Sequence, residues 1–499
     1  MQIPEFIFQI IEKINNNDFE VFLVGGCVRD LLMNKNPKDW DLTTNAKPAE
    51  MLKIFKDAKY ENDFGTVLLP LKNKEGETEN LIEITTYRSE KGYSDRRHPD
   101  EIFFEKDLDK DLERRDFTVN AMALGPLKDT KDFKIKNAQE LNLNVPKNWF
   151  LIDLFGGEKD IKKKIIRAVG EPSDRFKEDA LRMIRAIRFS SQLNFEIEAK
   201  TERNILKFSG SIKFIAKERI KDELIKILKT DLAYEGFILM YKTKLLRYII
   251  PELYLGENMK QNHHHIYTVL RHSFLSLKNC PSKIWQVRFA SLLHDIGKPK
   301  SRGEKNGITT FYNHEYIGER LTRKIMQRLK FSSADTERVA NLVRNHMFYY
   351  DADEVTASSV RRLIRKVGRE NLKDLMDVRI ADRLGSGTPK AKPYKLRHLE
   401  YMMEKVQNDP VSVKMLKING DELIKILNIK PGPKIGAILD VLLSEVIEDP
   451  RNNNKEYLEK RSYELDKMNL EDLRKKAKEA IEEKREEDDQ KIKKEHWVK

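Results

Sequence analysis

The stretch Gly25-Gly26-Cys27-Val28-Arg29-Asp30 follows the apolar run Val21–Val24 directly. The run predicts a buried strand, and the pattern from Val28 to Met33 predicts the start of a helix. Two glycines at the turn between them let the backbone approach a bound group closely, with amide N–H groups directed at it. The stretch therefore predicts an α/β domain whose first strand-to-helix turn binds phosphate.

Two aspartates, Asp39 and Asp41, follow this turn after a short gap. On the predicted strand Trp40–Thr43, residues two apart point to the same side. Paired carboxylates can hold two Mg²⁺ ions, which position a triphosphate and activate an attacking hydroxyl. A glycine turn or an Asp-x-Asp pair alone is common on ordinary loops. Their order and spacing together predict a polymerase-type site for nucleotidyl transfer.

A second motif, Arg114-Arg115-Asp116-Phe117-Thr118-Val119-Asn120-Ala121, lies further along the chain. Together with the glycine turn and the Asp39/Asp41 pair, it resembles the class II tRNA nucleotidyltransferases, the CCA-adding enzymes, whose relatives include bacterial poly(A) polymerases. The resemblance extends through Leu228 and resumes at Lys430–Gly436. It implies an α+β fold: a small mixed α/β nucleotidyltransferase head (polymerase-beta-like), followed by a mostly α-helical neck, body and tail.

The resemblance also assigns roles to residues of the head. It makes Asp39 and Asp41 the catalytic ligands of two Mg²⁺ ions, with Glu83, on a later predicted strand, as a candidate third carboxylate. Nucleotide-binding residues implied by the motifs are Gly25, Gly26, Arg29, Arg114, Asp116, Asn120, Asp179, Arg182 and Arg185. Arg29 suits triphosphate oxygens, because guanidinium binds them in a bidentate manner. Asp116 suits a ribose 2′-hydroxyl, which would favour NTP over dNTP.

Base selection is expected at Glu178–Arg185, a stretch that predicts an amphipathic helix. Asp179 and Arg182 are three residues apart, so they are neighbours on one helix face. On most helices such a pair is an ordinary surface ion pair. The resemblance identifies them as the nucleotide-selecting pair. An ionised Asp only accepts and Arg only donates hydrogen bonds. Cytosine and adenine offer an amino donor beside a ring-nitrogen acceptor, whereas uracil and guanine present the reverse.

Three further segments resemble family motifs. Asp153–Gly157 resembles the connection between head and neck, read as a flexible glycine pair that lets the neck helix turn. Arg88–Phe104, with Arg96 and Arg97, resembles the flexible loop of enzymes that add the terminal A. Ile215–Ile220 resembles the last neck motif, interpreted as packing and helix-capping support.

A second set of ligand-type residues follows in Ser291-Leu292-Leu293-His294-Asp295-Ile296-Gly297-Lys298. The order His272, His294-Asp295, Asp382 resembles the HD superfamily of metal-dependent phosphohydrolases. That likeness implies one divalent transition-metal ion on these four residues, with His314 and His346 for a second ion or a phosphate. It implies a phosphodiesterase or phosphatase, or a domain that binds metal without turnover. His263, His264 and His265 read as an exposed, adventitious metal binder.

Composition narrows the class of protein and its partners. The chain has 499 residues, 39% hydrophobic and 35% charged, and its lysines and arginines exceed its acidic residues by 94 − 81 = 13. No apolar run approaches the roughly 18 residues of a membrane span, and two cysteines make no disulfide framework. A cytoplasmic protein with tRNA, CTP and ATP as partners, and no obligate protein partner or membrane, is expected. The basic surplus fits a polyanion or simply a solvated lysine-rich surface.

The chain divides by pattern into a head (1–140), a helical neck and body (141–255), an HD domain (256–385) and a helical tail (386–499). Predicted strands are 21–24, 40–43, 67–70, 81–86 and 102–104, and 128–148 reads as an exposed polar excursion. Predicted helices include 161–168, 176–192, 197–208 and 216–228, whereas the charged stretch 470–494 reads as a solvated helix, an RNA-contacting arm or a frayed end. Open alternatives are an A-adding enzyme, a poly(A) polymerase and, remotely, an HD signalling hydrolase with a nucleotide-sensing head.

Overall fold

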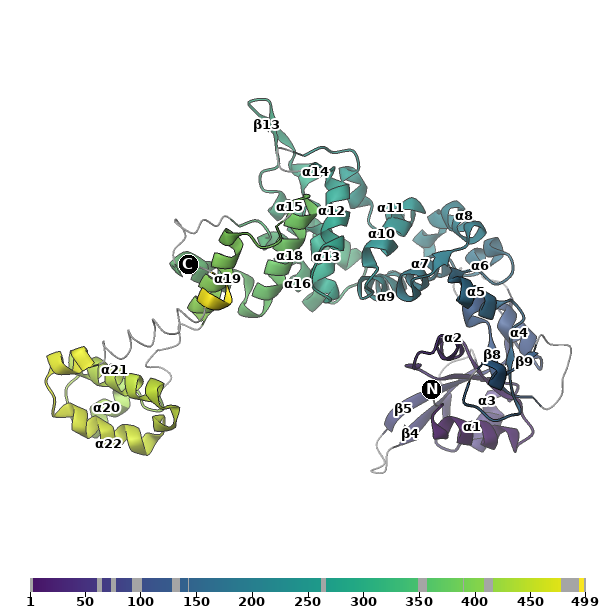
Figure 1. The fold of residues 1–499 in the computed structure, drawn as a ribbon, viewed down its shortest axis with the longest axis horizontal. Coiled ribbons are helices and arrows are strands. Elements are labelled where there is room, and N and C mark those ends of the chain that lie inside the picture. The colour runs from purple at the N-terminus through teal and green to yellow at the C-terminus, as the bar shows by residue number, and fades with distance from the viewer. Residues whose placement is uncertain are drawn as a thin grey trace. The chain divides into compact units, whose positions relative to one another are not determined.

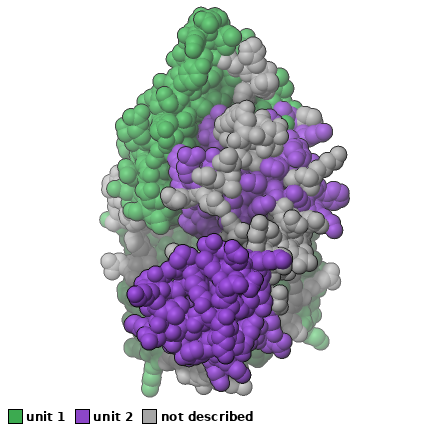
Figure 2. Space-filling view, turned by 90° about the vertical axis from the view of Figure 1, so that its left-hand side faces the viewer, with its two compact units in different colours: residues 1–344, 377–387 green, residues 345–376, 388–499 purple. Residues whose placement is uncertain are grey.

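A computed structural model shows the fold (Figure 1). It describes residues 3–60, 65–72, 78–91, 101–127, 135–141, 143–261, 266–348, 357–388, 390–407, 416–476 and 493–497. The chain forms two compact units, 1–344 with 377–387, and 345–376 with 388–499 (Figure 2). The four-part division expected from sequence patterns stays a prediction.

The first unit begins with a mixed sheet in the order β3-β4-β5-β2-β1-β8-β10-β9. Its neighbours pair antiparallel except β2 and β5, which run parallel. The strands are β1 (Val21–Val24), β2 (Asp41–Thr44), β3 (Lys59–Tyr60), β4 (Thr66–Lys72), β5 (Thr78–Thr86), β8 (Ala123–Pro126), β9 (Ile135–Asn137) and β10 (Trp149–Ile152).

Both faces of this sheet are covered, which explains the continuous apolar run of β1. Val21 and Leu23 pack in one core with α1 (Glu5–Asn15), α2 (Gly26–Leu32) and α3 (Pro48–Ile54). Phe22 and Val24 pack in a second core with α4 (Leu108–Glu113). Side chains alternate between the two faces because the strand period is two.

The five predicted strands are present, with ends shifted by up to three residues. The last of them, β7 (Glu101–Phe104), pairs with β6 (Arg88–Lys91) in a separate hairpin. The sequence reading missed β8 and β10. For β8 the reason is that Ala-Leu-Gly-Pro has little strand propensity, and pairing with β1 and β10 decides its conformation. The predicted excursion at 128–148 is partly wrong, since β9 joins the sheet and Val145 is buried.

The rest of the first unit is mainly helical, with a small β13–β14 hairpin (Gly303–Lys305 and Ile308–Thr310). Its helices are α5 (Gly157–Lys163), α6 (Pro172–Glu178), α7 (Leu181–Leu193), α8 (Ala199–Phe208), α9 (Lys217–Leu228), α10 (Ala233–Lys242), α11 (Leu245–Ile249), α12 (Val269–Lys278), α13 (Trp285–Leu293), α14 (Lys298–Ser301), α15 (His314–Arg328) and α16 (Ser333–Asn345). The predicted helix 161–168 is wrong in its second half, because β11 (Ile165–Ile166) pairs with β12 (Glu196–Ile197).

The second unit contains α17 (Ala357–Val367), the first turn of α18 (Leu372–Gly385) up to residue 376, α19 (Tyr394–Gln407), α20 (Gly420–Leu427), α21 (Pro433–Glu448) and α22 (Lys455–Asp466). A separate core of buried residues, including Leu423, Ile438 and Leu458, holds α20, α21 and α22 together. Part of the charged stretch 470–494 lies outside the described residues. Within the described part of the chain, we find no helix with the length and apolarity to cross a membrane.

Candidate active site

The parallel pair β2–β5 places two carboxylates side by side. Asp41 lies directly opposite Glu83 in the register, and the next residues, Leu42 and Ile84, also face each other. Leu42 and Ile84 belong to the core on one face, so Asp41 and Glu83 share the other face. Paired residues of neighbouring strands are about 4.8 Å apart. This register supports Glu83 as a third carboxylate, a role that stays a prediction.

The structure places Asp39 differently from the sequence expectation. Asp39 is exposed in a bend, and β2 begins only at Asp41, so the two aspartates do not share a strand. On the β1 side this follows from the register, because Leu23 pairs with Leu42 and β1 ends at the next residue, Val24. Burial raises the pKa of Asp41, Arg115 opposes that rise, and Asp39 adds to it. A cation is therefore favourable beside Asp41.

The first glycine of the turn makes room for this charge. Gly25 has a φ of 77°, in the left-handed region that favours glycine. A Cβ atom there would lie 3.2 Å from Arg115 Nη1 and 3.5 Å from Asp41 Oδ2. Gly25 therefore borders the carboxylate directly, as predicted for a turn that approaches a ligand closely.

Four predicted nucleotide-binding residues form one hydrogen-bonded network. Arg29 Nη1 donates to Asn120 Oδ1 at 2.7 Å, and Asn120 Nδ2 donates to Asp116 Oδ1 at 3.3 Å. Asp116 Oδ2 pairs with Arg185 at 2.6 Å. Burial would raise the pKa of Asp116, but Arg185 and Arg182 lower it overall. Asp116 is thus held as an ionised acceptor between the head and α7.

Two residues of the site escaped the sequence reading, Arg115 and Asp111. Asp111 is fully buried; its Oδ1 accepts from Arg114 at 2.6 Å and its Oδ2 from Arg115 at 3.1 Å. Burial alone would raise the pKa of Asp111, yet the two arginines lower it. An aspartate three and four residues before an Arg-Arg pair is the helical spacing that could have indicated the contact.

The two residues predicted to select the base do not lie on one continuous helix, so the prediction of a shared helix face is wrong. Helix α6 ends at Glu178, Asp179 has extended backbone angles, and α7 begins at Leu181. Asp179 Oδ2 pairs with Arg219 at 2.7 Å. Arg182 donates to Glu178 Oε2 at 2.6 Å and to the carbonyl of Arg114 at 3.0 Å. Arg182 therefore links α7 to the second head motif.

The glycine motif that follows β10 is tightly packed. Asp153 accepts from the backbone amides of Gly157 and Glu158 at 2.7 and 3.0 Å, which caps α5. A Cβ at Gly157 would lie 2.3 Å from the carbonyl oxygen of Thr118. Gly157 is thus needed for close contact between α5 and the second motif. Turning of the neck at this motif stays a prediction.

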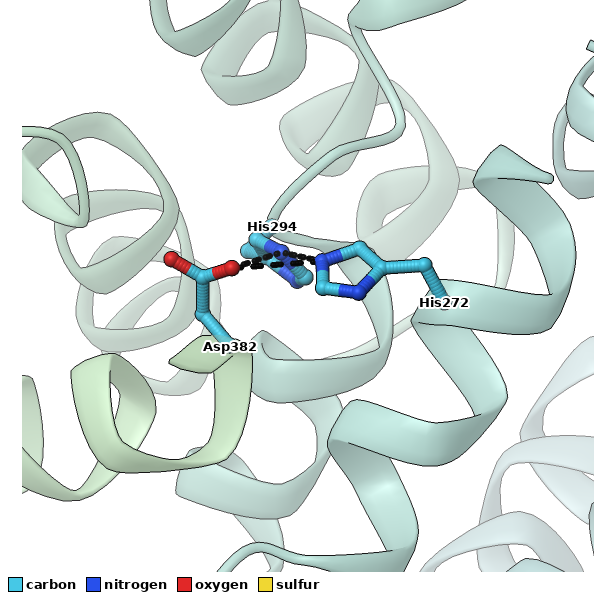
Figure 3. Close-up of side chains that lie close together, drawn as sticks. All are labelled: His272, His294 and Asp382. Carbon is cyan, nitrogen blue, oxygen red and sulfur yellow. Dashed lines mark hydrogen bonds and ion pairs between the residues drawn. The ribbon is translucent and has the colours of Figure 1, made fainter. Parts of the chain in front are cut away.

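A buried cluster of imidazoles and carboxylates lies between α12, the end of α13 and α18 (Figure 3). His272 Nε2 is 3.0 Å from His294 Nε2 and 3.2 Å from Asp382 Oδ1. Asp295 Oδ2 lies 3.3 Å from both Nε2 atoms. The ligand atoms of His272, His294 and Asp382 all fall within 4.8 Å of one another.

These residues fit a divalent transition metal. His294 Nδ1 lies 2.8 Å from the Ser291 carbonyl, so it acts as donor there and leaves Nε2 for a metal. Mixed imidazole and carboxylate ligands suit such ions. Burial lowers the pKa of His294, but Asp295 and Asp382 outweigh burial and raise that pKa to about 10. The two carboxylates thus make this a site that attracts positive charge.

Two further predicted histidines, His314 and His346, are buried as well. His314 Nε2 lies 3.4 Å from Asp295 Oδ1, so His314 joins the edge of the cluster. His346 is buried in the second unit, and His263–His265 lie outside the described residues. The arginines of the predicted loop, Arg96 and Arg97, also fall outside them. The sequence reading missed Lys298, whose Nζ is 2.6 Å from Asp295 Oδ2.

Together the mixed sheet, its paired carboxylates and the arginine network define a nucleotide-transferring head domain. A family model described as "Poly A polymerase head domain" matches residues 21–167. A model for the RNA- and SrmB-binding site of polymerase A matches 194–255, and one for tRNA nucleotidyltransferase domain 2 matches 303–461. These matches cover the head, the neck and most of the helical remainder.

Relatives that match two thirds of the chain or more narrow the class of protein further. A CCA-adding enzyme of Enterococcus faecalis is 30% identical over 90% of this chain and 93% of its own length. An A-adding tRNA nucleotidyltransferase of Deinococcus radiodurans is 33% identical over 67% of this chain and 74% of its own. The chain belongs to the tRNA nucleotidyltransferase family that includes the CCA-adding enzymes. The resemblance drawn from the sequence motifs is thereby confirmed at the level of the family.

The fold agrees with this assignment. The crystal structure of the Bacillus stearothermophilus CCA-adding enzyme in complex with CTP superimposes with a TM-score of 0.56. It covers 93% of this chain and 98% of that enzyme at 23% sequence identity. At that identity the likeness shows the shared fold, a mixed α/β head followed by a helical body, as predicted.

Proposed function

We propose that this chain adds the sequence CCA to the 3′ end of tRNA, using CTP and ATP and releasing pyrophosphate. The observation that carries the proposal is that the first unit contains both the predicted metal-binding carboxylates and the predicted nucleotide-selecting arginine. Asp41 and Glu83 lie in register beside the glycine turn, and Arg182 ties α7 to Arg114 of the second motif. The similarity to the Enterococcus faecalis CCA-adding enzyme over nearly the whole chain supports it.

Asp39 and Asp41 would hold Mg²⁺, with Glu83 beside them. Carboxylate oxygens are the ligands that Mg²⁺ prefers, and a cation beside Asp41 would offset the burial that raises the pKa of this carboxyl group. When bound, two Mg²⁺ ions supply charge stabilisation for in-line transfer. The tRNA 3′-hydroxyl oxygen bonds to the α-phosphorus, the bond from α-phosphorus to the bridging oxygen breaks, and pyrophosphate leaves.

The buried arginines would orient the nucleotide. Arg29 and Arg115 border the glycine turn and supply donors for triphosphate oxygens. Asp116 and Asn120 are connected to Arg29, and an ionised Asp116 can accept from a ribose 2′-hydroxyl. These residues bind and orient CTP or ATP in preference to the deoxynucleotides.

Base choice would be made by the protein itself. Asp179 accepts from the exocyclic amino group of cytosine or adenine, and Arg182 donates to the ring nitrogen beside it. Uracil and guanine reverse the order of donor and acceptor and leave buried polar groups unpaired. The same Asp–Arg pair therefore accepts CTP and ATP and rejects UTP and GTP.

Nucleotide addition to three tRNA transcripts tests this function. The transcripts end before CCA, after C and after CC, and each receives one labelled NTP with Mg²⁺. C addition to the first two, and a single A on the third, is the expected result. Addition only to the CC-ended transcript would assign the chain to A-adding enzymes, the class of the Deinococcus radiodurans relative. Long A tracts would assign it to the poly(A) polymerases, and no addition contradicts the proposal.

The substrate also sets the expected binding behaviour. A surplus of 13 basic residues suits tRNA as a polyanionic partner. Affinity for tRNA should fall steeply with salt, because phosphate contacts release counterions. A cytoplasmic location, where tRNA and both nucleotides are present, is part of this proposal.

A second activity is favoured by the buried histidine cluster. His272, His294 and Asp382 converge on one point with Asp295 beside them, which suits one divalent ion for phosphoester hydrolysis. We infer a phosphodiesterase or phosphatase of the HD type, acting on cyclic phosphate at damaged RNA 3′ ends.

Release of the cyclic phosphate from a labelled RNA end, with added Mn²⁺, Co²⁺ or Ni²⁺, tests this activity. Metal binding without hydrolysis would leave a metal site that has no turnover. Hydrolysis without any nucleotide addition would instead favour the signalling hydrolase with a sensing head.

A further inference from the structure

Arg219 makes a two-pronged ion pair with one of the two base-selecting residues. It lies in the first turn of α9, far from Asp179 in the sequence. Arg219 Nη2 is 2.7 Å from Asp179 Oδ2, and Nη1 is 3.4 Å from Oδ1. The side chain of Asp179 is 13% exposed and that of Arg219 is 29% exposed. A forked contact of this kind fixes the plane of the carboxylate.

Asp179 needs such a partner because no helix holds it. Its backbone is extended at the junction of α6 and α7. Its remaining contact is local, because Oδ1 accepts from the Leu181 amide at 2.9 Å. A carboxylate offers about four acceptor positions, so these contacts leave capacity for the amino group of a base. Arg219 therefore sets the direction of Asp179 without using up its acceptors.

One turn further on, helix α9 also makes an ion pair with α7. Glu223 Oε2 accepts from Arg188 Nε at 2.6 Å, and both side chains are buried. Arg182, by contrast, is held by Glu178 and by the Arg114 carbonyl. The acceptor and the donor of the selecting pair are thus positioned by different elements, α9 for Asp179 and α6 with the head for Arg182.

We propose that Arg219 is a positioning residue for nucleotide selection, which aims the Asp179 carboxylate at the amino group of CTP or ATP. This goes beyond the packing and capping support expected of Ile215–Ile220, and it rests on the proposed function. Without Arg219, Asp179 keeps only its local hydrogen bond and can rotate away. The acceptor then no longer discriminates between an amino group and a carbonyl oxygen.

Arg219→Gln tests this role through selectivity. The ratio of kcat/KM for CTP over UTP, and for ATP over GTP, should fall by about tenfold, since hydrogen bonds to charged groups are the strong ones. Arg219→Lys keeps the charge but loses the fork, so its loss should be smaller. Lys221→Gln, on the same helix and paired with Asp222, is the matched control and should keep wild-type selectivity.

A double-mutant cycle separates positioning from general damage to the fold. In an Asp179→Asn background, Arg219→Gln should cause no further loss of selectivity, because the carboxylate it aims is gone. Additive losses, or unchanged selectivity in Arg219→Gln, overturn the proposal. If the wild-type chain added no nucleotide, the proposed function would fail instead, so the two failures are distinct. The melting temperature and tRNA affinity of each variant complete the comparison.

Discussion

The head carboxylates and the helical histidine cluster differ in how completely the folded chain assembles them. Asp41 and Glu83 stand on neighbouring strands, with Asp39 in an exposed bend beside them. His272 on α12, His294 directly after α13 and Asp382 on α18 are buried. Their Nε2 and Oδ1 atoms lie within 3.6 Å of one another. The first set includes an exposed carboxylate, Asp39, whereas the residues of the second set are buried.

This difference follows from what each ligand set must bind. Oxygen ligands on neighbouring strands suit Mg²⁺, which keeps waters and substrate phosphates among its ligands. Imidazoles fixed by backbone carbonyls suit a resident transition metal. The head site should therefore depend on nucleotide for its completion, and the cluster should bind metal by itself. Each prediction below tests one side of this contrast.

The largest effect is expected from Asp41→Asn. Loss of this carboxylate should lower nucleotide addition by at least about a thousandfold, because metal charge stabilisation supplies several kcal/mol. Single-turnover addition of CTP to tRNA measures it. Binding of tRNA and metal content at the histidine cluster should stay unchanged. Retained addition would show that Asp41 is not a metal ligand of the head.

Removal of a buried histidine should lower metal binding at the histidine cluster and leave nucleotide addition by the head unchanged. His294→Ala should lower the affinity for Mn²⁺ or Co²⁺ by more than about a hundredfold, since even outer partners of metal ligands matter by 10–100-fold. Calorimetric titration of the metal-free protein measures this, and nucleotide addition serves as the control. Equal loss of addition would show that the two sites are not separable.

Asp111→Asn tests how far the buried carboxylate of Asp111 stabilises the head. It removes the shared partner of Arg114 and Arg115 and should cost about 3 kcal/mol of stability at neutral pH, because two charges lose a buried counter-ion. Urea unfolding monitored by circular dichroism measures it. Thr43→Val, which removes hydrogen bonds to Asp111 at 3.3 Å and to the Thr85 carbonyl at 3.1 Å but no charge, is a milder control.

The loss of stability in Asp111→Asn should depend on pH. The folded-state pKa of Asp111 is lowered, so its contribution is present above the unfolded value of about 3.9 and is lost as pH falls through the folded pKa. The difference in stability between wild type and Asp111→Asn should therefore shrink below about pH 4. A difference that stays constant down to acid unfolding would contradict the ion-pair explanation.

The smallest expected effect is on the selectivity between nucleotides and not on the rate of addition. Arg182→Ala should reduce the preference for CTP over UTP by about ten- to thirtyfold, while tRNA binding persists, since the donor to the base is lost. Competition between labelled CTP and UTP measures it directly. Lys177→Ala, an exposed neighbour on α6 paired with Asp174, should leave the preference intact.

Much of the head could be predicted because its signals are local. An apolar run, a glycine pair and a following helix pattern appear within a dozen residues, and β1 and α2 follow them closely. Strand β8 could not be predicted, because burial between β1 and β10 overrides the weak propensity of Ala-Leu-Gly-Pro. The break between α6 and α7 was likewise hidden, since the stretch has continuous helical periodicity.

The sequence by itself determined which chemical groups are available. The motifs around Gly25, Asp41, Asp116 and Arg182 indicate the family, and their residue types define acceptors, donors and metal ligands. Only the tertiary structure decided which of them meet. The parallel register sets Glu83 beside Asp41, and helix packing brings Arg219 to Asp179 across 40 residues of chain. The physical reason is that ion pairs and metal sites depend on distances of a few ångströms, which packing of distant segments sets and local spacing does not.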